Sequence, residues 1–428
     1  MKKIKFLLSA ASLSLLVLSA NAQDSTQVAK SNSTIKNSKT DVTDRPFGKG
    51  IINYTAKDGS WSTKMTMRFQ TLYTYGHNVS ENLGITGSYS NFMIRRARLK
   101  FTGHAYSPKL KYKLELGQSS RDVGGFTTKS ENKNAPGLVF DAVVKWNFAK
   151  GLYFWAGQTK LPGNRERVIS SGSLQLVDRS LLNSNFNVDR DMGIQLHHKW
   201  KIGNMVIKEK VALSQGEGRD IVINNLGGYS YTPRVEILPF GEFDSKGKDD
   251  YSGSSLKRTK KYKLALAGGF DWNDRAARTG GHGGSFLVND SKLGYHTSNI
   301  TTIFIDMIMK YKGWSLMAEY ANRTAENAIA KNIDGSKTGK VVMEGLSYNV
   351  MGGYLFSRNW EITGRYTTVD YANQYTLETG KTDVTQYTVG LSKYLAGHKL
   401  KVQADVSLKQ TLNKDDGYLG RIHMELQF

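Results

Sequence analysis

The sequence has 428 residues, with 59 Lys and Arg against 37 Asp and Glu, which gives a formal net charge of +22. It contains 43 Gly, 6 Pro, 22 Tyr, 17 Phe and no Cys. The absence of Cys excludes a disulfide scaffold, a CxxC redox site and a thiolate zinc site, and the aromatic content argues against an intrinsically disordered chain. A cation excess of this size requires an anionic partner, such as nucleic acid, a membrane surface or small anions.

The first 22 residues have the pattern of a secretory signal peptide, with a basic start, an apolar run over 6–18 and the small residues Ala20 and Ala22 before the cleavage point. The apolar run is shorter than an ordinary membrane-spanning helix, and no uninterrupted apolar run of about 18 residues follows it. Export argues against a nucleic-acid partner. Residues 23–60 are predicted to form a polar, flexible leader, and residues 61–428 are predicted to form the folded domain.

Apolar and polar residues alternate over many short segments of the folded domain. At the end of the chain, Ile422 and Met424 alternate with His423 and Glu425, and the aromatic Phe428 closes the sequence. Since successive side chains of a strand point to opposite faces, this pattern predicts strands with one dry face and one wet face.

Sixteen such segments can be counted, and the connections between them are alternately short and long. An even number of strands of about ten residues, with short turns at one end and longer loops at the other, is typical of a transmembrane antiparallel β-barrel. A soluble sandwich or solenoid also shows alternation, but aromatic residues at the strand ends and the signal peptide favour the barrel. The connection 241–261 is long and charged where a short turn is expected. The segments lie near 61–75, 92–105, 110–118, 138–148, 151–160, 191–201, 204–214, 229–240, 262–272, 300–311, 313–323, 346–356, 359–369, 385–395, 399–410 and 419–428.

Cations predominate on the faces of the first strands that would line the barrel interior. Sixteen strands enclose an aqueous lumen, and fixed cations on its wall lower the barrier for anions and raise it for cations. Arg95 has the wrong parity for its strand, so it is predicted to mark a β-bulge or to snorkel. The alternative is that the cations pair with interior carboxylates and only stiffen the wall. The predicted wall residues of the anion path are Lys64, Arg68, Arg96, Arg98, Lys100, Lys111, Lys113 and Lys145.

The connection from Leu161 to Arg190 mixes charged residues with apolar ones such as Leu174 and Leu182. A solvated external loop has no need of these leucines, whereas folding the loop into the lumen would bury them. The loop is therefore predicted to fold inward and to constrict the channel. The cations expected at the narrowest point are Arg165, Arg167, Arg179 and Arg190.

Several stretches of the chain resemble the phosphate-selective porin O and P family of outer-membrane channels. They are IRRARLKFTGHAYSPKLKYKLELG from Ile94, GQTKLPGNRERVISSGSLQLVDRSL from Gly157, RDMGIQL from Arg190 and YTPRVEILPF from Tyr231, together with the terminal Phe428. The resemblance implies a sixteen-stranded, trimeric barrel whose third external loop folds inward to form the constriction. It also implies an anion path bearing Arg and Lys, and membrane insertion guided by the C-terminal aromatic strand that ends in Phe428.

No pattern in the sequence points to catalysis, since HExxH, GxSxG and Walker motifs are missing. The glycines around His282 are typical of a flexible external loop, and no enzyme activity, cofactor or metal is expected. Three functions remain open: an anion-selective porin for phosphate or similar small anions, a general or oligosaccharide-conducting porin with weak selectivity, and a plugged barrel with an adhesin or enzyme role. The expected location is the outer membrane. The expected partners are small anions, outer-membrane lipid and lipopolysaccharide, the insertion machinery and further copies of the chain in a homotrimer.

Overall fold

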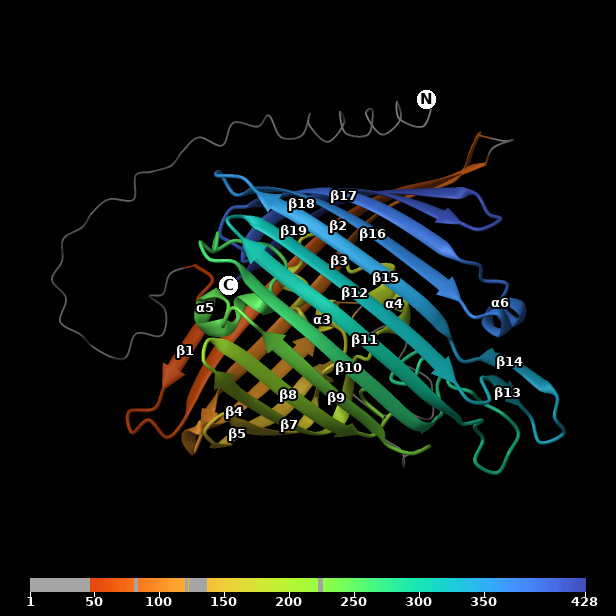
Figure 1. The fold of residues 1–428 in the computed structure, drawn as a ribbon, viewed down its shortest axis with the longest axis horizontal. Coiled ribbons are helices and arrows are strands. Elements are labelled where there is room, and N and C mark those ends of the chain that lie inside the picture. The colour runs from red at the N-terminus through yellow and green to blue at the C-terminus, as the bar shows by residue number, and fades with distance from the viewer. Residues whose placement is uncertain (1–46, 81–83, 120–121, 123–136, 222–225) are drawn as a thin grey trace. The chain divides into compact units, whose positions relative to one another are not determined.

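The computed structural model describes residues 47–80, 84–119, 122, 137–221 and 226–428. They form a closed barrel of sixteen antiparallel strands, in which each strand pairs with its neighbours along the chain (Figure 1). The barrel strands are β2 (Ser62–Ser80), β3 (Gly84–Ala105), β4 (Ser107–Gly117), β5 (Val139–Ala149), β6 (Leu152–Lys160), β7 (Arg190–Ile202), β8 (Met205–Ser214), β9 (Ser230–Leu238), β10 (Lys263–Ala276), β11 (Ser298–Tyr311), β12 (Trp314–Ala325), β15 (Gly345–Leu355), β16 (Trp360–Tyr371), β17 (Val384–Tyr394), β18 (Leu400–Thr411) and β19 (Asp416–Gln427).

The last strand closes the barrel on the first. β19 pairs with β2 from Asp416 opposite Val79 to Gln427 opposite Arg68. Each of the sixteen predicted segments corresponds to one of these strands, so the predicted all-β barrel is confirmed. The short strand β1 (Ile52–Thr55) pairs with the start of β2, so the sheet begins inside the stretch 23–60 that the sequence assigns to a leader. The predicted signal peptide, residues 1–22, lies outside the described residues.

The alternating pattern sorts side chains between the two faces of the barrel. On β19, Ile422 and Met424 are 41% and 47% exposed on the outer face, whereas His423 and Glu425 are buried inside. This is the arrangement expected of strands that meet lipid outside and polar groups inside. The inner face of β11 departs from it, because Phe304 and Ile308 are apolar and buried there.

A β-bulge interrupts β3 at Arg95. Gln70 of β2 lies opposite Arg96, and the next residue, Thr71, lies opposite Ile94, so Arg95 is the extra residue. Such a bulge shifts the face on which the following side chains point. Arg95 and Arg96 therefore both reach into the barrel interior, where each contacts Asp178. The predicted bulge is confirmed.

The connections differ sharply between the two ends of the barrel. At one end most are short, as in the two-residue turn Gly203-Asn204, where Gly203 takes the positive φ of 56° that such a turn requires. At the other end the loops carry a small hairpin and helices. No helix among the described residues is long and apolar enough to cross a membrane. The remaining elements are α3 (Arg165–Val168), η2 (Ser171–Ser173), α4 (Leu181–Phe186), α5 (Asp244–Gly247), η3 (Asp249–Tyr251), α6 (Asn373–Thr379), β13 (Ile329–Lys331) and β14 (Lys337–Val341).

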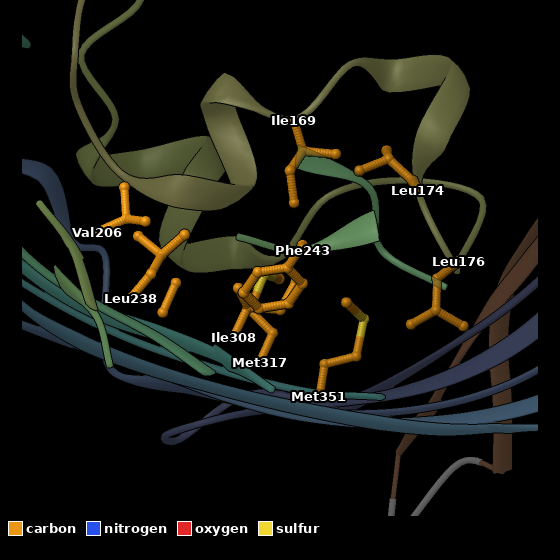
Figure 2. Packing of buried hydrophobic residues seen from close by; sticks show 10 residues of the cluster. Ile169, Leu174, Leu176, Val206, Leu238, Phe243, Ile308, Met317 and Met351 are labelled. Atoms are coloured by element: carbon orange, nitrogen blue, oxygen red, sulfur yellow. The ribbon is translucent and has the colours of Figure 1, made fainter. Parts of the chain in front are cut away.

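Residues 161–189, between β6 and β7, fold into the barrel and are called the inward segment below. Its apolar side chains pack on the wall in two clusters. In the first, Ile169 and Leu176 face Ile308, Met317 and Met351 of the wall (Figure 2). In the second, the wholly buried Leu182 and Phe186 pack against the wall around Phe304. These contacts explain the apolar inner face of β11, and the prediction that this connection folds inward is confirmed.

Candidate functional site

A cavity of about 820 Å³ lies between the inward segment and strands β3 to β8. The strands supply one wall and the inward segment supplies the other. Tyr251, Lys248 and Gly247, from the connection between β9 and β10, also line it. The inward segment leaves this space because its apolar residues pack on other strands, among them β11, β12 and β15.

Cations greatly outnumber carboxylates in the cavity lining. The four acidic side chains of the lining are Glu115, Asp122, Asp141 and Asp189. The fourteen cations are Arg95, Arg96, Arg98, Lys113, Lys145, Lys160, Arg167, Arg179, Arg190, Lys199, Lys208, Lys210, Arg219 and Lys248. In general, fixed charge of one sign on the wall of a pore favours ions of the opposite sign.

Seven of the twelve cations predicted for the anion path lie in this lining, namely Arg96, Arg98, Lys113, Lys145, Arg167, Arg179 and Arg190. The other five lie elsewhere. Arg68 is buried on β2, where it donates to Ser171 Oγ at 3.0 Å. The remaining four, Lys64, Lys100, Lys111 and Arg165, are also outside the lining.

Arg165 anchors the inward segment to the wall. Its side chain is wholly buried, and its Nε donates to Asp306 Oδ1 of β11 at 2.7 Å. Asp306 also accepts hydrogen bonds from Arg234 of β9 at 2.7 and 2.9 Å. A pair this deeply buried holds its position strongly, because separating it leaves an uncompensated charge away from water.

Two arginines of the inward segment, Arg167 and Arg179, line the cavity and also bind groups of their own segment. Arg179 donates to the carbonyl oxygens of Glu166 and Ile169 at 2.8 and 2.7 Å, and Arg167 pairs with Asp189. Burial and the neighbouring Arg179 and Arg190 hold the pKa of Arg167 well below its usual range. Burial likewise lowers the pKa of Arg179 to about 10. An added anion would therefore stabilise both guanidinium groups.

Asp178 is the meeting point of three cations. It pairs with Arg95 at 2.8 Å, Arg96 at 3.5 Å and Arg421 at 3.4 Å. Burial alone would raise the pKa of the Asp178 carboxyl, but the three guanidinium groups hold it below its usual range. The tip of the inward segment is thereby fixed to β3 and β19.

Two aromatic side chains of the β3–β8 wall, Trp155 and Phe140, make cation–π contacts with cations of the cavity lining. The Lys145 ammonium lies 3.4 Å from the centre of the Trp155 ring, and His197 stacks on Trp155 with ring centres 4.1 Å apart. Phe140 carries the guanidinium groups of Arg98 at 4.2 Å, Arg190 at 4.9 Å and Arg219 at 4.0 Å. Cation–π contacts of this kind hold positive charge in place without neutralising it.

Several cations of the lining were not predicted as path residues: Arg95, Lys160, Lys199, Lys208, Lys210, Arg219 and Lys248. A signal for some of them was present. Lys208 and Lys210 alternate with Ile207 and Val211 on β8, and the alternation places both lysines on the inner face. Alternation gives no such signal for Lys160. Its position in the cavity depends on contacts with the irregular inward segment, where its ammonium group donates to the carbonyl oxygens of Arg167, Val168 and Ile169. Within the described part of the chain, no group of three or more His, Asp or Glu side chains is placed to hold a metal ion.

Comparison with known proteins places most of the chain in one family. The family model described as phosphate-selective porin O and P matches residues 64–417. An uncharacterized protein of Aquifex aeolicus (strain VF5) is 21% identical over 391 residues, which cover 85% of this chain and 87% of that protein.

Solved structures of outer-membrane channels share the fold. The channel DcaP of Acinetobacter baumannii matches with a TM-score of 0.53 at 12% identity, covering 88% of this chain and 99% of that one. OmpF of Salmonella typhi, in complex with daunomycin, matches with a TM-score of 0.53 at 11% identity, covering 88% and 100%. An anion-selective porin from Comamonas acidovorans matches with a TM-score of 0.50 at 11% identity, covering 86% and 100%. At these identities the likeness concerns the fold.

Proposed function

Because the chain belongs to the phosphate-selective porin O and P family, we propose that this outer-membrane channel is anion-selective and admits phosphate or similar small anions through the cavity between the inward segment and β3–β8. The observation that carries the proposal is the composition of the cavity lining, with fourteen cations and four carboxylates. Charge fixed on a pore wall selects ions of the opposite sign. The Comamonas acidovorans porin indicates that this fold is compatible with anion selectivity.

The kinds of cation in the lining favour oxyanions. Arg guanidinium groups present planar, multidentate donors that match phosphate oxygens, whereas a Lys ammonium acts as a compact point charge. Burial and neighbouring arginines lower the pKa values of both Arg167 and Arg179. An anion that enters beside them offsets this unfavourable clustering of charge.

The second candidate, an oligosaccharide-conducting porin, would draw on aromatic residues of the lining such as Tyr153 and Trp155. Sugar stacking needs an open ring face. Lys145 of β5 and His197 of β7 approach Trp155 from the two strands that flank β6, so this ring offers a sugar little free surface. The anion channel is therefore preferred over the oligosaccharide channel.

We further propose that the chain is exported by its N-terminal signal peptide and works as a homotrimer in contact with lipopolysaccharide. The terminal Phe428, whose backbone N–H donates to Met67 O at 3.0 Å, would guide insertion by the outer-membrane machinery. A chain lacking Phe428 is then expected to accumulate unassembled, which the heat-dependent gel mobility of the barrel would show.

The proposed selectivity is tested by the reversal potential of the purified protein in a planar bilayer under a KCl gradient. The double variant Arg167→Gln/Arg179→Gln is compared with Lys257→Gln/Lys260→Gln, which removes two exposed cations outside the cavity lining. We expect an anion-selective wild type, a marked loss of selectivity in the arginine variant and no change in the lysine variant. Inhibition of the chloride current by added phosphate then tests the solute. A weakly selective or cation-selective wild type would overturn the proposal.

A further inference from the structure

The connection between β9 and β10, residues 239–262, is called the insert below. It lies at the end of the barrel where most other connections are short turns, and it carries α5 and η3 (Figure 1). In barrels of this type the short turns face the periplasm. The contacts of the insert with the barrel wall and with the inward segment explain why a connection at this end is so long.

Buried charges fix the insert inside the barrel. Asp250 is wholly buried and accepts a hydrogen bond from Lys208 Nζ of β8 at 2.6 Å. On another part of the wall, Lys310 Nζ of β11 donates to Asp249 Oδ2 at 3.1 Å and to the carbonyl oxygen of Ser254 at 2.9 Å. These contacts hold the insert rigidly, because breaking a buried ion pair leaves an uncompensated charge.

The insert also contacts the inward segment, which enters the barrel from the opposite end. The backbone N–H of Gly253 donates to Ser173 O at 2.8 Å, and Arg165 Nη1 donates to Asp250 O at 3.3 Å. Phe243 is buried in the same apolar cluster as Ile169, between the two segments and the wall (Figure 2). The two segments therefore meet inside the barrel, and they share one apolar cluster with the wall.

Further contacts extend the insert toward the C-terminal strands. Ser252 Oγ hydrogen-bonds His398 Nε2 at 2.9 Å, and Arg258 donates to Asn359 Oδ1 at 3.1 Å in the turn before β16. On its other side, the Tyr251 hydroxyl donates to Glu236 Oε2 at 2.8 Å and accepts from Lys210 Nζ at 2.6 Å. The insert thus spans the barrel from β8 to the turn before β18, and of its described side chains and glycines, Gly247, Lys248 and Tyr251 line the cavity.

We propose that the insert is a second constriction, which seals the interior behind the inward segment and makes solutes leave the cavity past Lys248 and Tyr251. This rests on the proposed function only in taking the barrel as a channel. In this arrangement the inward segment sets the selectivity at the outer entrance, and the exposed Lys248 sets the charge at the exit.

The seal is tested by replacing residues 239–262 with the two-residue turn Gly-Asn that joins β7 to β8. We expect the single-channel conductance to rise severalfold and larger neutral sugars to enter proteoliposomes. An unchanged conductance with the same sugar size limit would overturn the proposal. The sugar assay is independent of ion selectivity, so this result separates failure of the second constriction from failure of the anion-channel proposal.

Cysteine labelling tests the exit in a chain that keeps the insert, in case the shortened barrel does not assemble. The chain contains no native Cys, so Lys248→Cys provides a single thiol in the cavity and Lys257→Cys provides a matched exposed thiol of the insert outside it. We expect an anionic methanethiosulfonate to reduce the current severalfold in Lys248→Cys and to leave Lys257→Cys unchanged. Equal currents before and after complete labelling of Lys248→Cys, verified by mass, would contradict the proposed exit.

Discussion

Arg95 and Asp178 form an ion pair of 2.8 Å that joins the bulge of β3 to the inward segment. Without the bulge, Arg95 would point to the lipid face and could not reach this carboxylate. Asp178 also holds Arg421 of β19 at 3.4 Å, and its carbonyl oxygen accepts from Arg365 of β16 at 2.8 Å. One extra residue in a strand thus lets a single carboxylate connect the inward segment to the wall near the closing seam of the barrel.

Asp178→Asn is expected to increase the preference for anions. The substitution removes a carboxylate that faces Arg95, Arg96 and Arg421 beside the cavity, and it keeps the size of the side chain and one acceptor oxygen. Because the pKa of Asp178 lies below its usual range, the carboxylate stays ionised through mildly acidic pH, and the difference between variant and wild type should persist there. Reversal potentials at several pH values measure both effects. Asp334→Asn, in the exposed turn between β13 and β14, is the matched control, and a lower anion preference in Asp178→Asn would refute the expectation.

Arg165→Met is expected to destabilise the barrel by about 3 kcal/mol, the scale of breaking a buried ion pair. The Asp306 carboxylate would remain buried with one guanidinium partner, Arg234, in place of two. Arg167→Met is the matched comparison, because Arg167 and its partner Asp189 keep 18% and 28% of their side-chain surface exposed, so breaking this half-buried pair should cost less than breaking the wholly buried one. Denaturant unfolding in lipid vesicles gives both free energies. Equal losses in the two variants would show that Arg165 is not the stronger anchor.

Glu217, in the loop between β8 and β9, is expected to make stability depend on pH. Burial and the nearby Asp191 carboxylate raise the pKa of Glu217 to about 7, from a usual value of 4.5. Below pH 4.5 the group is protonated in both the folded and the unfolded chain and carries no penalty. As the pH rises toward 7, the unfolded chain gains stability by releasing the proton, so the folded state weakens.

Glu217→Gln removes this titration. The melting temperature of the variant should approach that of the wild type near pH 4.5 and exceed it increasingly up to about pH 7. Thermal unfolding followed by circular dichroism over this range measures the difference. A constant difference across the range would mean that Glu217 does not titrate as inferred.

Periodicity predicted the barrel well and the irregular segments poorly. Alternation fixes the face of Lys113 or Glu425, because each strand residue has only two possible directions. In the inward segment no such rule applies, so Arg165 and Arg167 look equivalent in sequence. One is wholly buried against Asp306, and the other lines the cavity. From the sequence, the insert could be recognised only as a connection longer than expected. Its position inside the barrel could not be predicted, because it depends on contacts with Lys208 and Lys310, which lie on strands distant in the sequence.

The partners of the inward segment also constrain the order in which the barrel assembles. Leu174 O accepts a hydrogen bond from Lys401 Nζ, 227 residues further along the chain, and Val177 N–H donates to Asp405 Oδ2, 228 residues away. Contacts between such distant parts of a chain form late, because the loop entropy must be lost first. The constriction therefore cannot reach its final position until β18, one of the last strands synthesised, is in place. A barrel that stops before β18 would leave the Leu174 carbonyl and the Val177 N–H without these partners, so this part of the inward segment would be attached to the wall less firmly than in the complete barrel.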